Sequence, residues 1–286
     1  MLTACEKSGF FRSVSESIVV VGLGQLGTVF ADGFLRLGHP VIPALRGASL
    51  ADLYEEHSPY AILVATGEDD LAGVLKAVPD GARDRVILIQ NELRPDQWLA
   101  HGVEPTVAIV WFEKRTGKAP HSVLPSVLHG SRAAWMERCF SKLGLPCRTV
   151  TSMNDLCHEL VLKNLYILGL NLTGLAQVGG ASPQQARDLL SDYKNLLDDV
   201  VGEILAVEHA LLAQAQMLAQ TQMPAQAKAL ADVHLDEERL RAELFDALRA
   251  DPEHSCAGRS ARRRLARTLE YAERFSIDTP HLKNLI

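Results

Sequence analysis

The sequence has few cysteines, no long uninterrupted apolar run and no excess of positive charge, and each shortage excludes a class of protein. Its five cysteines are an odd number without the spacing of metal ligands, so we expect free thiols and no metal site. The longest apolar stretch, 160–172, is broken by Lys163, Asn164 and Asn171, so it is too short and too polar for a membrane span. The formal net charge of −6 argues against a nucleic-acid surface.

What remains is the composition of an ordinary globular protein. With 286 residues, of which 47% are hydrophobic and 22% charged, the chain is long enough for two domains. The first sixteen residues contain Glu6 and Glu16 and lack the apolar core of a secretory signal. We therefore expect a cytoplasmic protein with no membrane partner and no nucleic-acid partner.

The most informative stretch is SIVVVGLGQLG at residues 17–27, where β-branched residues lead directly into three glycines. This pattern predicts a dinucleotide-binding turn: Gly22 reverses the chain, Gly24 lets the backbone approach a pyrophosphate, and Gly27 lets helix and strand pack closely. An amphipathic helix, 25–37, follows and ends at Gly38. The alternative is an ordinary glycine-rich turn. The predicted cofactor-binding residues of the turn are Gly22, Leu23, Gly24, Gln25, Leu26 and Gly27.

Strands and helices alternate over the first half of the chain. Strands are expected at 41–45, 60–65, 86–90, 106–112, 126–130 and 147–150, with helices at 51–57 (N-capped by Ser49), 69–78, around Trp98 and at 131–143. This alternation predicts an α/β fold with a doubly wound, mostly parallel sheet of Rossmann type. We place this domain at 17–150, after an N-terminal extension at 1–16.

The second half, 151–286, lacks strand signals and is predicted to be all-helical. Helices are expected at 153–178, at 182–220 after the capping sequence Ser182-Pro183-Gln184-Gln185, and at 235–250, with a kink at Pro224. The long helices carry more apolar surface than one small domain would hide, so we expect a homodimer.

Arg46 follows the second strand, about twenty residues after the glycine turn, where a carboxylate would bind the ribose 2′-hydroxyl of NAD. An arginine there offers a planar charged fork for a 2′-phosphate, which favours NADP(H) as cofactor. The alternative is a solvated arginine at the end of a strand.

Lys163 lies on a helix that is apolar around most of its circumference. At 100° per residue, Asn164, Asn171 and Gly174 lie on the same face as Lys163. A buried lysine needs a cavity, an ion pair or a bound anion, and a cleft facing a nicotinamide would supply one. The alternative is a lysine that reaches solvent from a core helix.

These motifs together resemble the ketopantoate reductases (2-dehydropantoate 2-reductases), of which the chain would be a divergent member. The resemblance rests on the glycine turn, Arg46, Gln90-Asn91 after a later strand, K-x7-N-L-T-G at 163–174 and Ile277-Asp278-Thr279-Pro280. It implies a Rossmann domain and a helical domain similar to that of 6-phosphogluconate dehydrogenases. It also implies that Lys163 is the general acid, that Asn171 positions substrate and that Gln90 and Asn91 lie beside the nicotinamide.

The chain departs from the family pattern at several positions. Ile167 replaces an asparagine, Val161 a tryptophan and Glu92 the glycine of a Q-N-G segment, and Thr66-Gly67-Glu68 stands where the family has a lysine. We nevertheless count Thr66 among the cofactor-binding candidates. The family's substrate-binding glutamate has no counterpart, and the basic run at 259–267 is interpreted first as a solvated helix face and second as a substitute anion site.

The sequence thus predicts an NADPH-dependent reductase of a small anionic carbonyl compound such as a 2-oxo acid. Protonated Lys163 would stabilise the developing oxyanion and deliver the proton, since its reference pKa of about 10.4 keeps it charged at neutral pH. Two alternatives remain. One is an NADP(H)-binding sensor or partner protein without turnover, and the other is a reductase of an imine or a larger hydroxy acid.

Overall fold

The computed structural model describes residues 16–114, 116–177 and 179–285. The expected N-terminal extension, apart from its last residue, lies outside these ranges, as do Cys5 and Glu6. The four described cysteines are free thiols. None of the described helices has the length and apolar character needed to cross a membrane.

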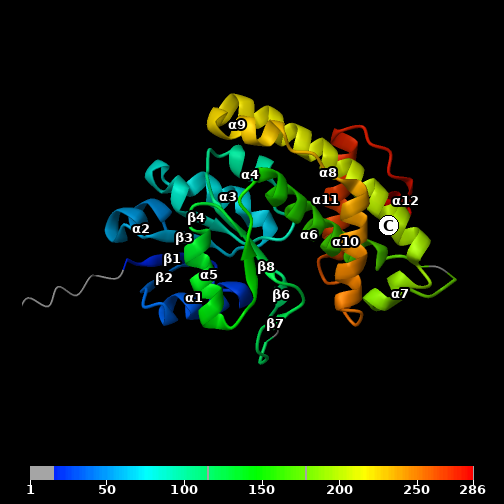
Figure 1. Cartoon of the computed structure of the whole chain (residues 1–286), viewed down its shortest axis with the longest axis horizontal. Coiled ribbons are helices and arrows are strands. Elements are labelled where there is room, and N and C mark those ends of the chain that lie inside the picture. Colours follow the sequence, from blue (N-terminus) through cyan, green and yellow to red (C-terminus); the bar gives the residue numbers. More distant parts are fainter. Residues whose placement is uncertain (1–15, 115, 178, 286) are drawn as a thin grey trace, which may run out of the picture.

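A seven-stranded sheet forms the first half of the chain, which we call the sheet half (Figure 1). Its spatial order is β2-β1-β3-β4-β5-β8-β9, and every neighbouring pair is parallel except β5 and β8. The predicted fold class is therefore confirmed. The strands are β1 (Ile18–Val21), β2 (Val41–Ala44), β3 (Ala61–Val64), β4 (Val86–Leu88), β5 (Thr106–Ile109), β8 (Ser126–His129) and β9 (Cys147–Thr149).

Both faces of the sheet are covered because alternate side chains of its buried strands point to opposite sides. On one face, Val20 packs with Phe30 of α1 (Gln25–Arg36) and Phe140 of α5 (Ala133–Leu143). On the other face, Val19 shares a core with Leu50 of α2 (Leu50–His57) and Leu75 of α3 (Leu71–Ala77). Ser49 caps α2 as predicted, accepting a hydrogen bond from the Asp52 N–H at 3.2 Å.

Short elements connect these layers. They are the 3-10 turns η1 (Glu68–Asp70) and η2 (Asp80–Arg85), the helix α4 (Pro95–Leu99) and the hairpin of β6 (Phe112–Glu113) and β7 (His121–Ser122). The strand expected at 106–112 is thus divided: β5 ends at Ile109, and its continuation pairs with β7 rather than with the main sheet.

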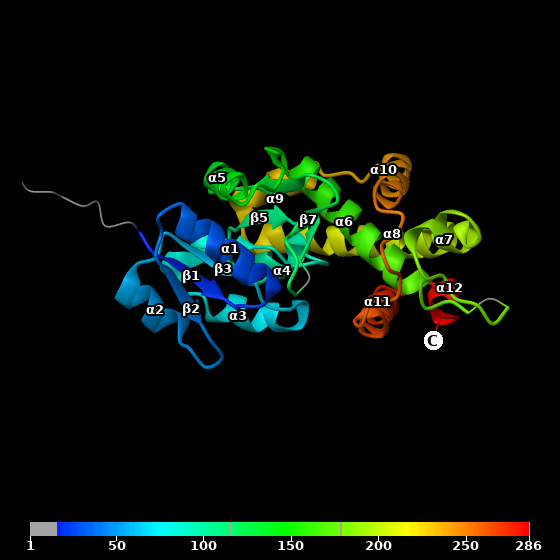
Figure 2. The same cartoon turned by 90° about the horizontal axis from the view of Figure 1, so that it is seen from below.

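The second half of the described chain is helical, and we call it the helical half. Its axis is α6 (Met153–Thr173), which packs against α8 (Lys194–Gln222), α10 (Glu237–Ala250) and α11 (Ala261–Arg274) (Figures 1 and 2). The helix α8 also reaches back to pack on α4 of the sheet half. The remaining helices are α7 (Ala186–Leu190), α9 (Pro224–Ala231) and α12 (Pro280–Lys283).

Two predicted helices have different limits in the structure. The long helix predicted at 182–220 is divided into α7 and α8, and α7 is capped by Gln185 and Asp188 rather than by Ser182. The Asp188 carboxylate accepts the N–H groups of Gln184 and Gln185, which fixes a later start. The helix predicted at 153–178 ends at Thr173, although Val178 itself is outside the described residues. The break at Pro224 is found as predicted, with the proline opening α9.

Candidate active site

The glycine turn has the backbone geometry that its three glycines predict. Gly22 has φ of +90°, and a Cβ there would lie 2.9 Å from the Ala65 carbonyl oxygen. A Cβ on Gly27 would lie 2.0 Å from the Gly22 oxygen, so only glycine lets α1 pack this closely on the turn. Gly24 precedes α1 and has open space around its Cβ position. Among the described residues, no side chain caps the start of α1, so its first N–H groups are available to an anion.

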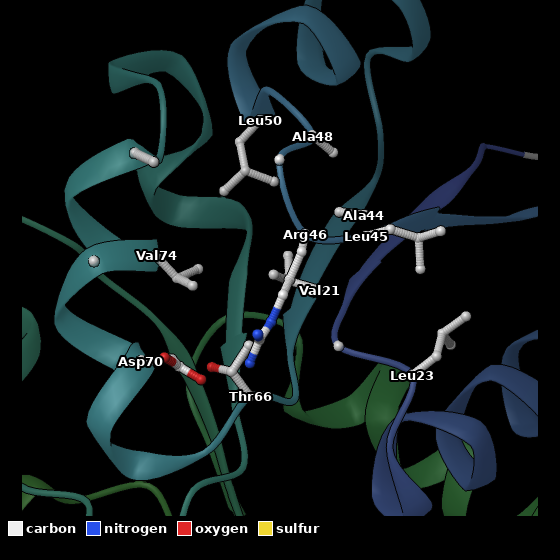
Figure 3. Close-up of a pocket in the computed structure, with 14 residues that line it drawn as sticks. Val21, Leu23, Ala44, Leu45, Arg46, Ala48, Leu50, Thr66, Asp70 and Val74 are labelled. Carbon is white, nitrogen blue, oxygen red and sulfur yellow. The ribbon is translucent and has the colours of Figure 1, made fainter.

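A pocket of about 540 Å³ lies beside this turn at the carboxyl ends of β1, β2 and β3 (Figure 3). Its volume lies within the range of ordinary cofactor sites. The carboxyl edge is also where open parallel sheets bind ligands. Among the predicted cofactor residues, Gly22, Leu23, Arg46 and Thr66 line it, together with Val21, Ala44, Leu45, Gly47, Ala48, Leu50, Asp70, Gly73, Val74 and Ala77.

Arg46 and Thr66 are polar residues in the lining of this pocket. Figure 3 shows the Arg46 side chain extending across it toward Thr66 and Asp70. The Thr66 hydroxyl oxygen is buried and has no hydrogen-bond partner among the described residues. An orphaned hydroxyl at a pocket wall fits a site that a polar ligand completes. Asp70, which the sequence did not single out, adds a carboxylate to the same pocket.

Other predicted cofactor residues make contacts within the protein. The Gln90 side chain donates to the Val64 carbonyl oxygen at 2.8 Å, so it fixes the end of β3. Asn91 follows at a turn and is partly exposed. The Gln25 amide donates to the Thr116 hydroxyl at 3.2 Å, which joins the start of α1 to the β6–β7 connection. Leu26 packs at the edge of the core under α1.

Lys163 is buried on α6, which argues against the alternative of a lysine that reaches solvent. Only 9% of the residue is exposed. Its Nζ lies 4.2 Å from the centroid of the Trp111 ring, just beyond the carboxyl end of β5, and 5.3 Å from that of Tyr166. Cation–π contact of this kind partly replaces the lost hydration of the ammonium. The lysine thus lies where the helical half meets the carboxyl edge of the sheet.

The burial of Lys163 changes its titration. Desolvation, and after it the nearby charge of Arg264, lower the pKa of Lys163 to about 7, while the charge of Glu113 opposes both effects. The lowered pKa departs from the expectation that this lysine is fully charged at neutral pH. A group that titrates near neutrality is well matched to proton transfer.

The two asparagines predicted beside Lys163 have different partners. Asn164 donates to the Glu208 carboxylate at 3.1 Å, and burial raises the pKa of Glu208 to about 7. The Asn171 side-chain oxygen accepts from Arg264 Nη1 at 3.0 Å. Gly174, on the same face of α6, is closely packed, since a Cβ there would lie 2.5 Å from the Ala257 nitrogen.

The basic run at 259–267 is a solvated helix face only in part. Arg259, Arg262 and Arg263 are exposed, as the sequence favoured, whereas Arg264 is buried and Arg267 is partly buried. Arg264 of α11 is 9% exposed and donates through Nε to Glu92 at 2.6 Å and through Nη2 to Glu68 at 3.2 Å. Arg267 donates to both Glu92 oxygens at 2.9 Å and to Asp69 at 2.7 Å. Helical periodicity alone could not show that these charges face the sheet half.

Glu92 explains one departure from the resembled family. Its φ of +53° lies in the left-handed region, so the backbone keeps a conformation that favours the glycine of the Q-N-G segment. A non-glycine residue in this region is strained by roughly 1–2 kcal/mol. The side chain is 6% exposed and paired with two guanidinium groups, which offset that strain and the cost of burying a carboxylate.

One cluster of side chains has the composition of a metal site. Single ligand atoms of Glu113, Asp251 and His254 lie within 4.8 Å of one another. His254 Nδ1 lies 3.0 Å from Glu113 and 3.1 Å from Asp251, so the imidazole bridges the two carboxylates. The cluster connects the β6–β7 hairpin to the loop between α10 and α11, and His254 packs edge-on against Tyr166. The absence of a metal stays a prediction.

Solved structures of other proteins share this architecture. A 2-dehydropantoate 2-reductase from Methylococcus capsulatus is 15% identical with a TM-score of 0.61, and the match covers 94% of each chain. A dimeric ketopantoate reductase from Staphylococcus aureus is 15% identical with a TM-score of 0.57 over 94% of this chain and 96% of that one. A D-mandelate dehydrogenase solved with NADH is 14% identical with a TM-score of 0.57 over the same shares. Neither a family model nor a curated protein matches the sequence. The chain has the fold of these enzymes.

Proposed function

We propose that this protein is an NADP(H)-dependent oxidoreductase that reduces a small 2-oxo acid or a related carbonyl compound. The observation that carries the proposal is the burial of Lys163 against Trp111, at the sheet edge where such folds bind their ligands. A buried cation that titrates near neutrality is typical of a functional site. The fold shared with two ketopantoate reductases and a mandelate dehydrogenase supports the reaction class.

The pocket beside the glycine turn fits the cofactor. Gly24 leaves room for a pyrophosphate at the start of α1, and the orphaned Thr66 hydroxyl offers a donor. Arg46 would hold the 2′-phosphate, which is the basis for preferring NADP(H) to NAD(H). NADPH, when bound, supplies the hydride for the carbonyl carbon.

The chain's own contribution is charge stabilisation and proton transfer. Protonated Lys163 would donate a hydrogen bond from Nζ to the carbonyl oxygen as negative charge develops there, and would then transfer the proton. Trp111 and Tyr166 exclude water from this ammonium, which strengthens its interaction with the oxyanion. Asn171 and Asn91 would keep substrate and cofactor in register.

We further propose a homodimer, a Rossmann domain at 17–150 and a substrate-binding and dimer-forming domain at 151–286. The Staphylococcus aureus neighbour is described as dimeric, which supports the first of these proposals. The second rests on the change from strands to helices between β9 and α6.

A two-step assay tests the function. NADPH fluorescence first measures binding, and its absorbance decay is then followed with 2-oxo acids, including ketopantoate, and with imines. Decay with a 2-oxo acid is the expected result. Binding without decay under any condition would instead identify a sensor, and decay with imines alone would identify an imine reductase.

A further inference from the structure

Arg264 is the second buried cation beside the proposed reaction centre. Its charge lowers the pKa of Lys163, which places the two cations within electrostatic reach of each other. It also donates at 3.0 Å to Asn171, the residue proposed to position substrate. A lysine and an arginine on adjacent helices, α6 and α11, therefore converge on one side of the sheet edge.

The three hydrogen bonds of the Arg264 guanidinium differ in how firmly they are held. Glu92 accepts from Nε at 2.6 Å, its side chain is 6% exposed, and it is also anchored by Arg267. Glu68 accepts from Nη2 at 3.2 Å, its side chain is 19% exposed, and it lies on a short 3-10 turn. The Glu68 contact is thus the longest and most accessible of the three.

We propose that Arg264 binds the carboxylate of the substrate, which displaces Glu68 from Nη2. This inference rests on the proposed reductase function and narrows its substrate to a 2-oxo acid whose carboxylate is adjacent to the reacting carbonyl. Lys163 would donate a hydrogen bond to the carbonyl oxygen, and Arg264 would bind the carboxylate. The planar guanidinium fork suits a carboxylate better than a point charge does.

The charge arrangement around Arg264 fits such an exchange. Glu92 and Asn171 hold the guanidinium in place during the exchange, so binding does not require Arg264 itself to move. Glu68 is close enough to the surface to be hydrated after its displacement. A neutral carbonyl compound forms no ion pair with Arg264 that would offset the loss of the Arg264–Glu68 pair. It would therefore bind less tightly than the acid.

The test compares a 2-oxo acid with its uncharged primary amide, for example pyruvate with pyruvamide. Binding to the NADPH-loaded protein is followed by fluorescence quenching, and turnover by NADPH absorbance. In R264K we expect the Kd and KM of the acid to rise about 10- to 100-fold with little change for the amide, since a charged hydrogen bond is lost. In E68Q we expect both constants for the acid to fall several-fold, because the competing carboxylate is gone.

Arg263→Lys is the matched control, since Arg263 lies on the same helix, is 62% exposed and pairs with Asp69. It should leave both ligands unaffected. Equal weakening of acid and amide in R264K, or weaker acid binding in E68Q, would overturn the role of Arg264. Acid binding that depends on Arg264 without any turnover would support the carboxylate site and refute the reductase. Equal turnover of the acid and the amide would support the reductase and refute the carboxylate site.

Discussion

The two proposed ligand sites of this molecule are built in opposite ways. The pocket beside β1, β2 and β3 is open, is shaped by glycine backbone and presents an arginine that extends across it. The region around Lys163 is buried, and its charged neighbours on α11 are already paired with carboxylates of the sheet half. The difference indicates a preformed site for a large cofactor and a closed site that a small substrate must open. Variants of the two sites should therefore have separable effects.

The largest expected effect is on turnover in K163A. Removing the proposed general acid should lower kcat by about 10³-fold, within the range that such groups contribute. The Kd for NADPH should stay within about twofold, because Lys163 is not among the residues lining the cofactor pocket. Steady-state kinetics and fluorescence titration measure both constants. K142A, which truncates an exposed lysine of α5, is the control, and parallel loss of binding and turnover in K163A would mean a structural lysine.

Gly24→Val tests the proposed cofactor site beside the glycine turn. A Cβ at Gly24 meets nothing within 4 Å, so the free protein should keep its melting temperature. A bulky side chain at the start of α1 should nevertheless keep a pyrophosphate from the helix N–H groups, and we expect the NADPH Kd to rise by about 100-fold. Unchanged NADPH affinity in a folded G24V protein would contradict a dinucleotide site at this turn.

Arg46→Ala tests whether the same pocket distinguishes NADPH from NADH. Loss of a charged contact to the 2′-phosphate should weaken NADPH binding about 10- to 100-fold, while NADH binding should change little. Both affinities are measured by fluorescence titration. R36A, which removes an exposed arginine paired with Asp32 on α1, should affect neither. A preference for NADH in the unmodified protein would exclude NADP(H) as its cofactor.

The smallest expected effect is a pH dependence of the reduction. The pKa of Lys163 is lowered to about 7, so its protonated, acid form is lost as the pH rises through that value. The kcat/KM should be level well below pH 7 and about tenfold lower at pH 8. Burial also raises the pKa of Glu208 to about 7, so the profile is repeated in E208Q. A fall that vanishes in E208Q would assign the titration to Glu208 instead.

The features that sequence could predict are those set by neighbouring residues. Gly22, Gly24 and Gly27 determine one local turn, and the apolar circumference of the helix around Lys163 indicated its burial without reference to any partner. The core strands were found for the same reason, because β-branched runs bounded by turns are local patterns.

The features that sequence missed depend on contacts between distant segments. Glu92 and Arg264 are 172 positions apart, so no spacing rule connects them. Asp188 sets the start of α7 because its carboxylate accepts the Gln184 N–H. The capping sequence at Ser182-Pro183 predicted an earlier start and gave no indication of this contact. The pKa of Lys163 likewise reflects burial and the charges of Arg264 and Glu113, which only the assembled halves provide.

The most direct test of the central claim is a crystal structure of the protein with NADPH. We expect the 2′-phosphate at Arg46, the pyrophosphate at the start of α1, and the nicotinamide on the side of the sheet edge that faces Lys163. A nicotinamide bound away from Lys163, or a lysine that turns to bulk solvent in the complex, would refute the proposed reaction.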